Sequence, residues 1–169
     1  IEGVAPSLIK YTEPVDYFAK TREEMAEYVK EEIRNMDVSF PVREGNQRRV
    51  KLFKNLKRDD SIIAGMIFSS SGLNYEESLF LNEIMSFDER KELLDIADKY
   101  QEPHDPKLRE MELGDRVAEF VISSSGFAQL KRHRMNTLIP QRYLYELGFT
   151  VPKSIESTDL GAEFEDIRY

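Results

Sequence analysis

The sequence contains no cysteine and only two histidines, His104 and His133, among its 169 residues. Without cysteine the chain can form neither a disulfide nor a thiolate metal site. Two histidines far apart in the sequence make no recognisable ligand set for a metal ion. We therefore expect no bound metal.

Long apolar runs are also missing. The densest run, IIAGMIF at 62–68, is far shorter than the roughly 20 residues that a membrane-spanning helix needs. No secretory signal, P-loop, Rossmann glycine pattern or Ser-His-Asp spacing is visible. We expect a cytoplasmic protein with no membrane partner. The first residue, Ile1, is not Met, which predicts a processed or truncated piece of a longer chain.

Acidic residues outnumber basic ones, 32 to 24, which gives a net charge of −8. An acidic chain of this kind argues against nonspecific binding to nucleic acid, because the phosphate backbone favours a broad basic face. It does not exclude a small basic pocket, since the field in a pocket depends mainly on the groups nearby. The length is that of one domain with a substantial core.

The apolar periodicity predicts an α+β fold that is rich in helix, with a mostly antiparallel sheet of strands that are not adjacent in sequence. In "SFDE" the spacing of Ser86 and Glu89 predicts a capping box. Asp59, Asp60 and Ser61 are capping candidates for an earlier helix. The predicted helices are 16–34, 58–69, 75–84 and 86 or 87 to 100; the predicted strands are 7–12, 50–56 and a strongly buried one containing Val117, Phe120, Val121 and Ile122; the predicted loops are 37–49 and 101–107.

Basic residues concentrate in GFAQLKRHRMNTLIPQRY at 126–143, which follows a Ser-Ser-Ser-Gly turn. We expect a helix over 127–134 and a strand-like segment over 136–145. On a helix each residue turns by about 100°, so Arg132 and Arg134 would point to nearly opposite sides, with His133 between them. Arginine suits a phosphate group because its planar fork donates two parallel hydrogen bonds. The alternative is a solvated cationic helix end that complements the helix dipole.

The stretch VAEFVISSSGFAQLKRHRMNTLIPQRY at 117–143 resembles the signature region of the flavin-dependent thymidylate synthase superfamily. There a buried strand and a Ser or Gly turn lead into a helix that ends in Arg-His-Arg, and the motif closes on Arg-Tyr. Residues 62–113 are similar in layout to the second domain of two-domain members. The resemblance is clearest over 50–156 and implies a single domain, 1–169, with the thymidylate synthase-complementing protein-like fold.

The resemblance implies an FAD-dependent methyltransferase that converts dUMP to dTMP with NADPH and methylenetetrahydrofolate. It also implies a homotetramer, or pairing with a second domain of the same type, with FAD bound between chains. The residues that it assigns to cofactor binding are Arg132, His133, Arg134 and His104, and those that it assigns to substrate binding are Gln129, Thr137, Arg142 and Tyr143.

The segment after Arg-His-Arg departs from the family pattern. It is two residues shorter, Thr137 takes the place of the first serine, and the second serine is absent. Ile139 stands where the family has asparagine, and its side chain cannot form a hydrogen bond to a pyrimidine. A non-catalytic nucleotide-binding, flavin-binding or assembly domain of the same fold is therefore the alternative. A nucleic-acid-binding module is a third reading, which the acidic charge disfavours.

Overall fold

The computed structural model describes residues 16–41, 49–148 and 151–160. Within these ranges the fold is α+β and rich in helix, with six α-helices and one two-stranded antiparallel sheet, as the sequence predicted. The predicted strand 7–12 and most of the predicted loop 37–49 lie outside the described residues. The elements are α2 Tyr17–Asn35, β1 Arg49–Phe53, α3 Arg58–Ser70, α4 Tyr75–Ile84, α5 Phe87–Lys99, the 3₁₀ helix η1 Arg109–Glu112, β2 Val117–Val121, α6 Ser124–Leu130, the 3₁₀ helix η2 Tyr145–Leu147 and α7 Lys153–Glu156.

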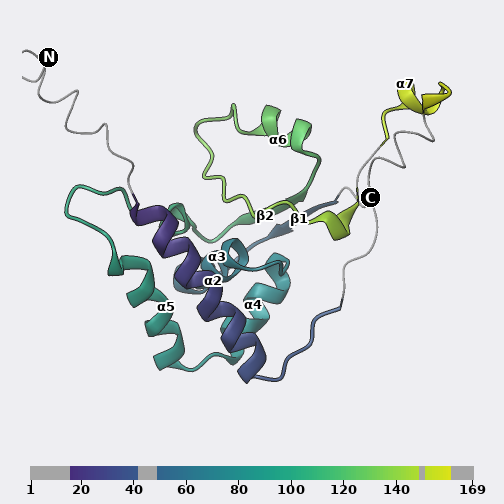
Figure 1. Ribbon diagram of the computed structural model, residues 1–169. Helices are drawn as coiled ribbons and strands as arrows, with labels where there is room; N and C mark the ends of the chain where they lie inside the picture. The colour runs from purple at the N-terminus through teal and green to yellow at the C-terminus, as the bar shows by residue number, and fades with distance from the viewer. Residues whose placement is uncertain (1–15, 42–48, 149–150, 161–169) are drawn as a thin grey trace, which may run out of the picture.

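Helices α2 to α5 pack together as a helical body beneath the sheet (Figure 1). Their apolar positions recur at helical spacing, so each helix buries one face against its neighbours. The resulting core contains fully buried side chains from all four helices. Among them are Met25, Val29, Met66, Ile67, Leu81 and Leu93.

Local capping signals explain where two of these helices begin. Ser86 and Glu89 form the predicted capping box at the start of α5. Asn74 and Glu77 form a second capping box at the start of α4, although this pair was missed in the sequence. The capping prediction for α3 is wrong: its N-cap is Lys57, which makes no side-chain cap, and Ser61 instead donates to the Lys57 carbonyl oxygen.

The sheet joins β1 to β2 across the intervening helices, so its strands are not adjacent in sequence. Side chains alternate between the two faces. On the inner face, Lys51 is ion-paired with Glu76 of α4, and the ring of Phe53 lies 5.0 Å from that of Tyr75. The other face points away from the helical body.

The burial predicted for the second strand is wrong. Of its five residues only Glu119 is buried, and it lies on the inner face opposite Lys51. Phe120 and the following Ile122 lie on the outer face and are exposed. An apolar strand sequence therefore does not lead to burial here, because no described element covers the outer face of the sheet.

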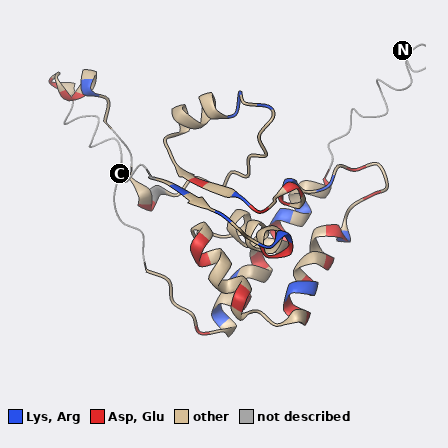
Figure 2. Ribbon diagram, turned by 180° about the vertical axis from the view of Figure 1, so that it is seen from behind, with Lys and Arg blue, Asp and Glu red and all other residues tan. Residues whose placement is uncertain are grey.

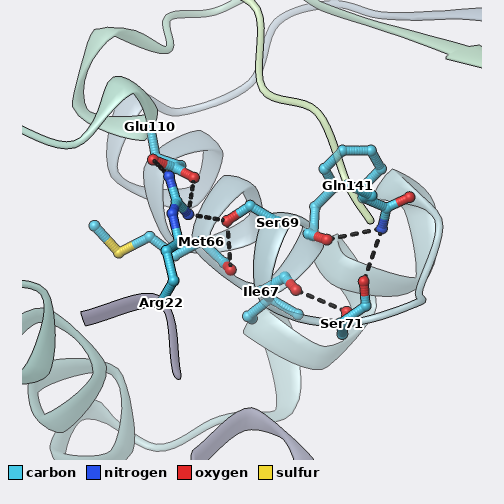
Figure 3. Close-up of polar contacts among 8 residues, drawn as sticks. Arg22, Met66, Ile67, Ser69, Ser71, Glu110 and Gln141 are labelled. Carbon is cyan, nitrogen blue, oxygen red and sulfur yellow. Dashed lines mark hydrogen bonds and ion pairs between the residues drawn. The ribbon is translucent and has the colours of Figure 1, made fainter. Parts of the chain in front are cut away.

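An ion pair between a half-buried guanidinium and a buried carboxylate joins α2, α3 and η1 (Figure 3). Arg22 donates to both carboxylate oxygens of Glu110, at 2.5 and 2.9 Å, and to the Ser69 hydroxyl at 2.6 Å. The Glu110 side chain is 0% exposed. η1 can approach α3 this closely because residue 65 is glycine: a Cβ there would lie 2.4 Å from the Leu113 side chain.

Across the described ranges, no helix is both long enough and apolar enough to cross a membrane.

Candidate anion-binding site

The predicted basic stretch lies in a segment that projects from the sheet on the side opposite the helical body. We call residues 122–144 the cationic arch. The arch leaves the end of β2, passes through α6 and returns toward the sheet before η2 (Figure 1). In Figure 2 the blue of Lys and Arg marks the ribbon of the arch beyond α6, a part that carries no Asp or Glu.

The basic residues do not lie on a helix, contrary to the prediction for 127–134. Helix α6 begins at Ser124 and ends at Leu130. A series of tight turns follows, in which the backbone N–H groups of Arg132, His133 and Arg134 donate to carbonyl oxygens two or three residues earlier. The helical argument for opposed arginines therefore does not apply. The segment 137–144 has no regular secondary structure and pairs with neither described strand, so the strand-like segment predicted over 136–145 is also wrong.

The charge of the arch is unopposed. Between Glu119 and Glu146 the sequence holds four basic residues and no acidic one. Lys131, Arg132, Arg134 and Arg142 are all exposed. None of the four forms an ion pair with a described carboxylate, whereas Arg22 and five lysines elsewhere in the described ranges do. The cations of the arch are free to bind an external anion.

Hydrogen bonds fix the returning half of the arch to the rest of the protein. The Gln141 side-chain amide donates to the carbonyl oxygens of Phe68 and Ser71, at 2.7 and 3.1 Å (Figure 3), and to that of Leu73 at 2.7 Å. Carbonyl groups at the end of a helix lack partners within the helix, so Gln141 satisfies groups that the end of α3 leaves open. The Thr137 hydroxyl donates to the Glu112 carboxylate of η1.

A hydrogen bond at the start of α6 stabilises the half of the arch that follows β2. The Ser123 hydroxyl accepts a hydrogen bond from the Gly126 N–H at 3.2 Å. This hydroxyl is therefore used as a helix cap rather than kept for a ligand. The backbone of Gly126 also lies close to the Ile122 side chain: a Cβ at residue 126 would lie 3.6 Å from the Ile122 Cβ. This places the first turn of α6 beside the end of β2.

Seven of the eight predicted site residues lie in the arch. Arg132, His133, Arg134, Arg142, Tyr143 and Gln129 are exposed, and Thr137 is half-buried. His104 lies apart from them, in the loop between α5 and η1 (Figure 1). This loop is held beside the start of α2, where the Tyr17 hydroxyl donates to the Pro106 carbonyl oxygen at 3.2 Å.

Burial raises the pKa of Tyr75 to about 12, and burial followed by the Glu89 charge raises the pKa of Glu32. Both residues belong to the helical body. No cluster of three metal-ligating side chains occurs among the residues that the structure describes.

Two sets of long-range contacts escaped the sequence prediction. Gln141 precedes Arg142 in the motif, but its partners are about 70 residues away in sequence. Arg22 and Glu110 pair across 88 residues. No local pattern identifies such partners, because each depends on how the helices pack.

No known protein family, curated protein or solved structure matches this chain. The chemistry available at the arch is therefore judged from its own residues. Three guanidinium groups and one ammonium group, exposed and without carboxylate partners, are suited to bind phosphate oxygens through charge-assisted hydrogen bonds.

Proposed function

We propose that the cationic arch binds the phosphate groups of a flavin or nucleotide, and that the chain is a flavin-dependent thymidylate synthase-like protein. The observation that carries this proposal is the cluster of exposed cations in an acid-free segment that is hydrogen-bonded to the folded protein through Gln141 and Thr137. A merely solvated loop would need neither the cluster nor the anchors.

The arch residues divide by chemistry. Arg132 and Arg134 lie at the outer turns, where their forks can each hold a phosphate oxygen pair of FAD. Arg142 directly follows the anchored Gln141, so its backbone is the best fixed of the four cations, and we assign it to the dUMP phosphate. His133 stands between the two arginines and adds a further donor when it is protonated.

In the proposed reaction dUMP is reductively methylated to dTMP, with carbon from methylenetetrahydrofolate and electrons from NADPH. FAD would supply the redox chemistry when bound. The task of this chain would be to hold phosphates and to orient the nucleotide. The exposure of the arch in one chain supports binding between subunits, where a second surface would enclose the ligand.

The second candidate is a non-catalytic nucleotide-binding or flavin-binding domain of the same type. One observation favours it specifically: the Thr137 hydroxyl, which takes the place of the motif's first serine, donates to Glu112. A hydroxyl engaged in this way is not available to donate to a pyrimidine. Ile139 offers no replacement.

Calorimetric titration of the wild type and of R132A/R134A with FAD, dUMP and inorganic pyrophosphate tests the proposal. Hydrogen bonds to charged groups are worth about 1.5–3 kcal/mol each, so we expect each lost arginine to weaken FAD binding by about tenfold or more. K30A/R34A is the matched control, because both of its residues are exposed cations on α2. Equal affinities of wild type and R132A/R134A for all three ligands would refute the proposal.

Turnover separates the two candidates. Formation of dTMP from dUMP with FAD, NADPH and methylenetetrahydrofolate supports the enzyme. Tight FAD or dUMP binding without any turnover supports the non-catalytic domain.

A further inference from the structure

The outer face of the sheet is an apolar surface on the same side of the protein as the cationic arch. Cross-strand neighbours place Val50 beside Phe120 and Leu52 beside Ala118. Val50, Leu52 and Phe120 are 64%, 55% and 44% exposed. We give the name apolar platform to Val50, Leu52, Ala118, Phe120 and Ile122. Exposed apolar surfaces of this kind commonly mark binding sites.

The platform has no counterpart inside the described chain. The helical body covers the inner face, through the contacts of Lys51 and Phe53 with α4. The arch stands over the outer side in both views (Figures 1 and 2) but leaves the platform exposed. All five residues of the platform are apolar.

The arch and the platform lie on the same side of the sheet (Figures 1 and 2), and one carries positive charge while the other is apolar and exposed. Such a surface fits a ligand that joins phosphate groups to a planar ring. A free phosphate would use only the arch, and an apolar partner would gain nothing from four unpaired cations. Bases and similar planar rings stack on apolar and aromatic side chains with a gain of about 1–3 kcal/mol each.

We propose that the apolar platform is the seat of the planar ring of the phosphate-bearing ligand, with Phe120 as its aromatic contact and Val50 and Leu52 as its aliphatic ones. This inference rests on the proposed function, because the arch must hold the phosphates. It adds a second subsite, formed by a sheet face outside the Arg-His-Arg motif. Ring-bearing ligands then bind more tightly than their phosphate groups alone.

The test compares FAD, which has both parts, with inorganic pyrophosphate, which has only the charge. The variant V50T/L52T replaces two exposed apolar side chains by threonine, which retains strand propensity. We expect FAD binding to weaken by about tenfold, a change that corresponds to 1.4 kcal/mol. Pyrophosphate binding is expected to stay at the wild-type value. The visible absorption band of bound flavin should also move toward that of flavin in water.

The matched control is I84T/F87T, which removes two exposed apolar side chains at the junction of α4 and α5. It should bind both ligands as the wild type does. Unchanged FAD affinity in V50T/L52T overturns the platform and leaves the arch intact. Unchanged affinity for FAD and pyrophosphate in R132A/R134A overturns the proposed function instead.

Two further results would overturn the platform by assigning it to another occupant. One is a wild-type dimer, measured by light scattering without ligand, that V50T/L52T converts to a monomer. The other is binding to anionic phospholipid vesicles that V50T/L52T abolishes. A ring-binding platform predicts that the wild type does not bind the vesicles. It also predicts that the wild type is a monomer, or that V50T/L52T preserves any oligomer it forms.

Discussion

An ion pair joins Arg22 of the helical body to Glu110 of η1 across 88 residues of sequence, whereas in the cationic arch Arg132 and Arg134 are exposed and have no described carboxylate partner. The first pair satisfies its own charge inside the fold. The second pair is left unsatisfied on a segment that is nonetheless hydrogen-bonded in place. The protein therefore uses the same residue type for two different purposes.

The difference separates residues that stabilise the fold from residues that the fold holds at the surface for ligand binding. Exposed charges contribute little to stability, while a buried charge that loses its partner is strongly destabilising. Substitutions in the helical body should therefore change the free energy of unfolding. Substitutions of the arch cations should change ligand binding alone.

The largest effect is expected for Glu110→Ala. The change leaves the Arg22 guanidinium beside the core with only the Ser69 hydroxyl as a described partner. The Arg22 side chain is 32% exposed, so water can solvate part of the unpaired charge. Hydrogen bonds to charged groups are worth about 1.5–3 kcal/mol, and we expect urea unfolding to show a loss of this order. E23Q is the control, because Glu23 is exposed on the same helix as Arg22. A loss below about 1 kcal/mol would show that the ion pair does not hold the helical body together.

A smaller effect is expected for Gln141→Ala, which removes the anchor between the arch and the end of α3. Three carbonyl oxygens lose their donor. Leaving buried polar groups unsatisfied costs about 1–3 kcal/mol, although water can replace part of the loss at this half-buried site. Faster amide exchange over 137–144 should accompany the lower stability. Q141N, whose shorter side chain keeps the amide, should fail to restore the contact. Normal exchange and stability in Q141A would mean that the arch is held by other contacts.

The comparison also shows which parts of the molecule the sequence could predict. The predicted helices 75–84 and 58–69 agree with α4 and α3 to within one residue, because apolar periodicity and turn residues act locally. The Ser86 capping box is of the same kind. The Asn74 capping box had an equally local signal and could have been found.

The sequence predictions are wrong where contacts between residues far apart in the sequence determine the local structure or burial. Phe120 is typical of a buried strand, but its face of the sheet receives no described cover. The helix predicted over 127–134 ends at Leu130, where turns take over just before the arginines. Clustering of the basic residues was visible in the sequence. Their anchor, Gln141, was not, because the end of α3 becomes its partner only after folding.

A third, intermediate effect concerns a buried carboxylate of the helical body and should stabilise the protein. Burial, and then the Glu89 charge, raise the pKa of Glu32, which is 9% exposed on α2. A raised pKa in the folded state means that the stability from the protonated form is present below the unfolded pKa of about 4.3. That stability is lost as the pH rises through the folded value.

Glu32→Gln removes the buried charge, so we expect an unfolding free energy about 1 kcal/mol higher at pH 7. This corresponds to a melting temperature about 2–4 °C higher. Below the unfolded pKa the difference should vanish. Thermal unfolding from pH 3 to pH 8 measures both points. E31Q, an exposed neighbour on the same helix, should show neither. A gain for E32Q that is equal at every pH would assign it to packing and not to ionisation.

The smallest effect on stability is expected for R132A/R134A, the variant with the largest expected effect on binding. Both side chains are exposed and lack described ion pairs, and surface changes of this kind usually stay within about 0.5 kcal/mol. The substitutions also reduce the repulsion between the like charges of the arch, which offsets part of any loss in the free energy of unfolding. Urea unfolding without ligand should therefore superimpose on that of the wild type. With FAD present the wild type alone should gain stability, since a ligand that binds only the folded state raises the unfolding free energy. If R132A/R134A instead unfolds more easily without ligand, the arginines stabilise the fold, and the contrast between the helical body and the cationic arch no longer holds.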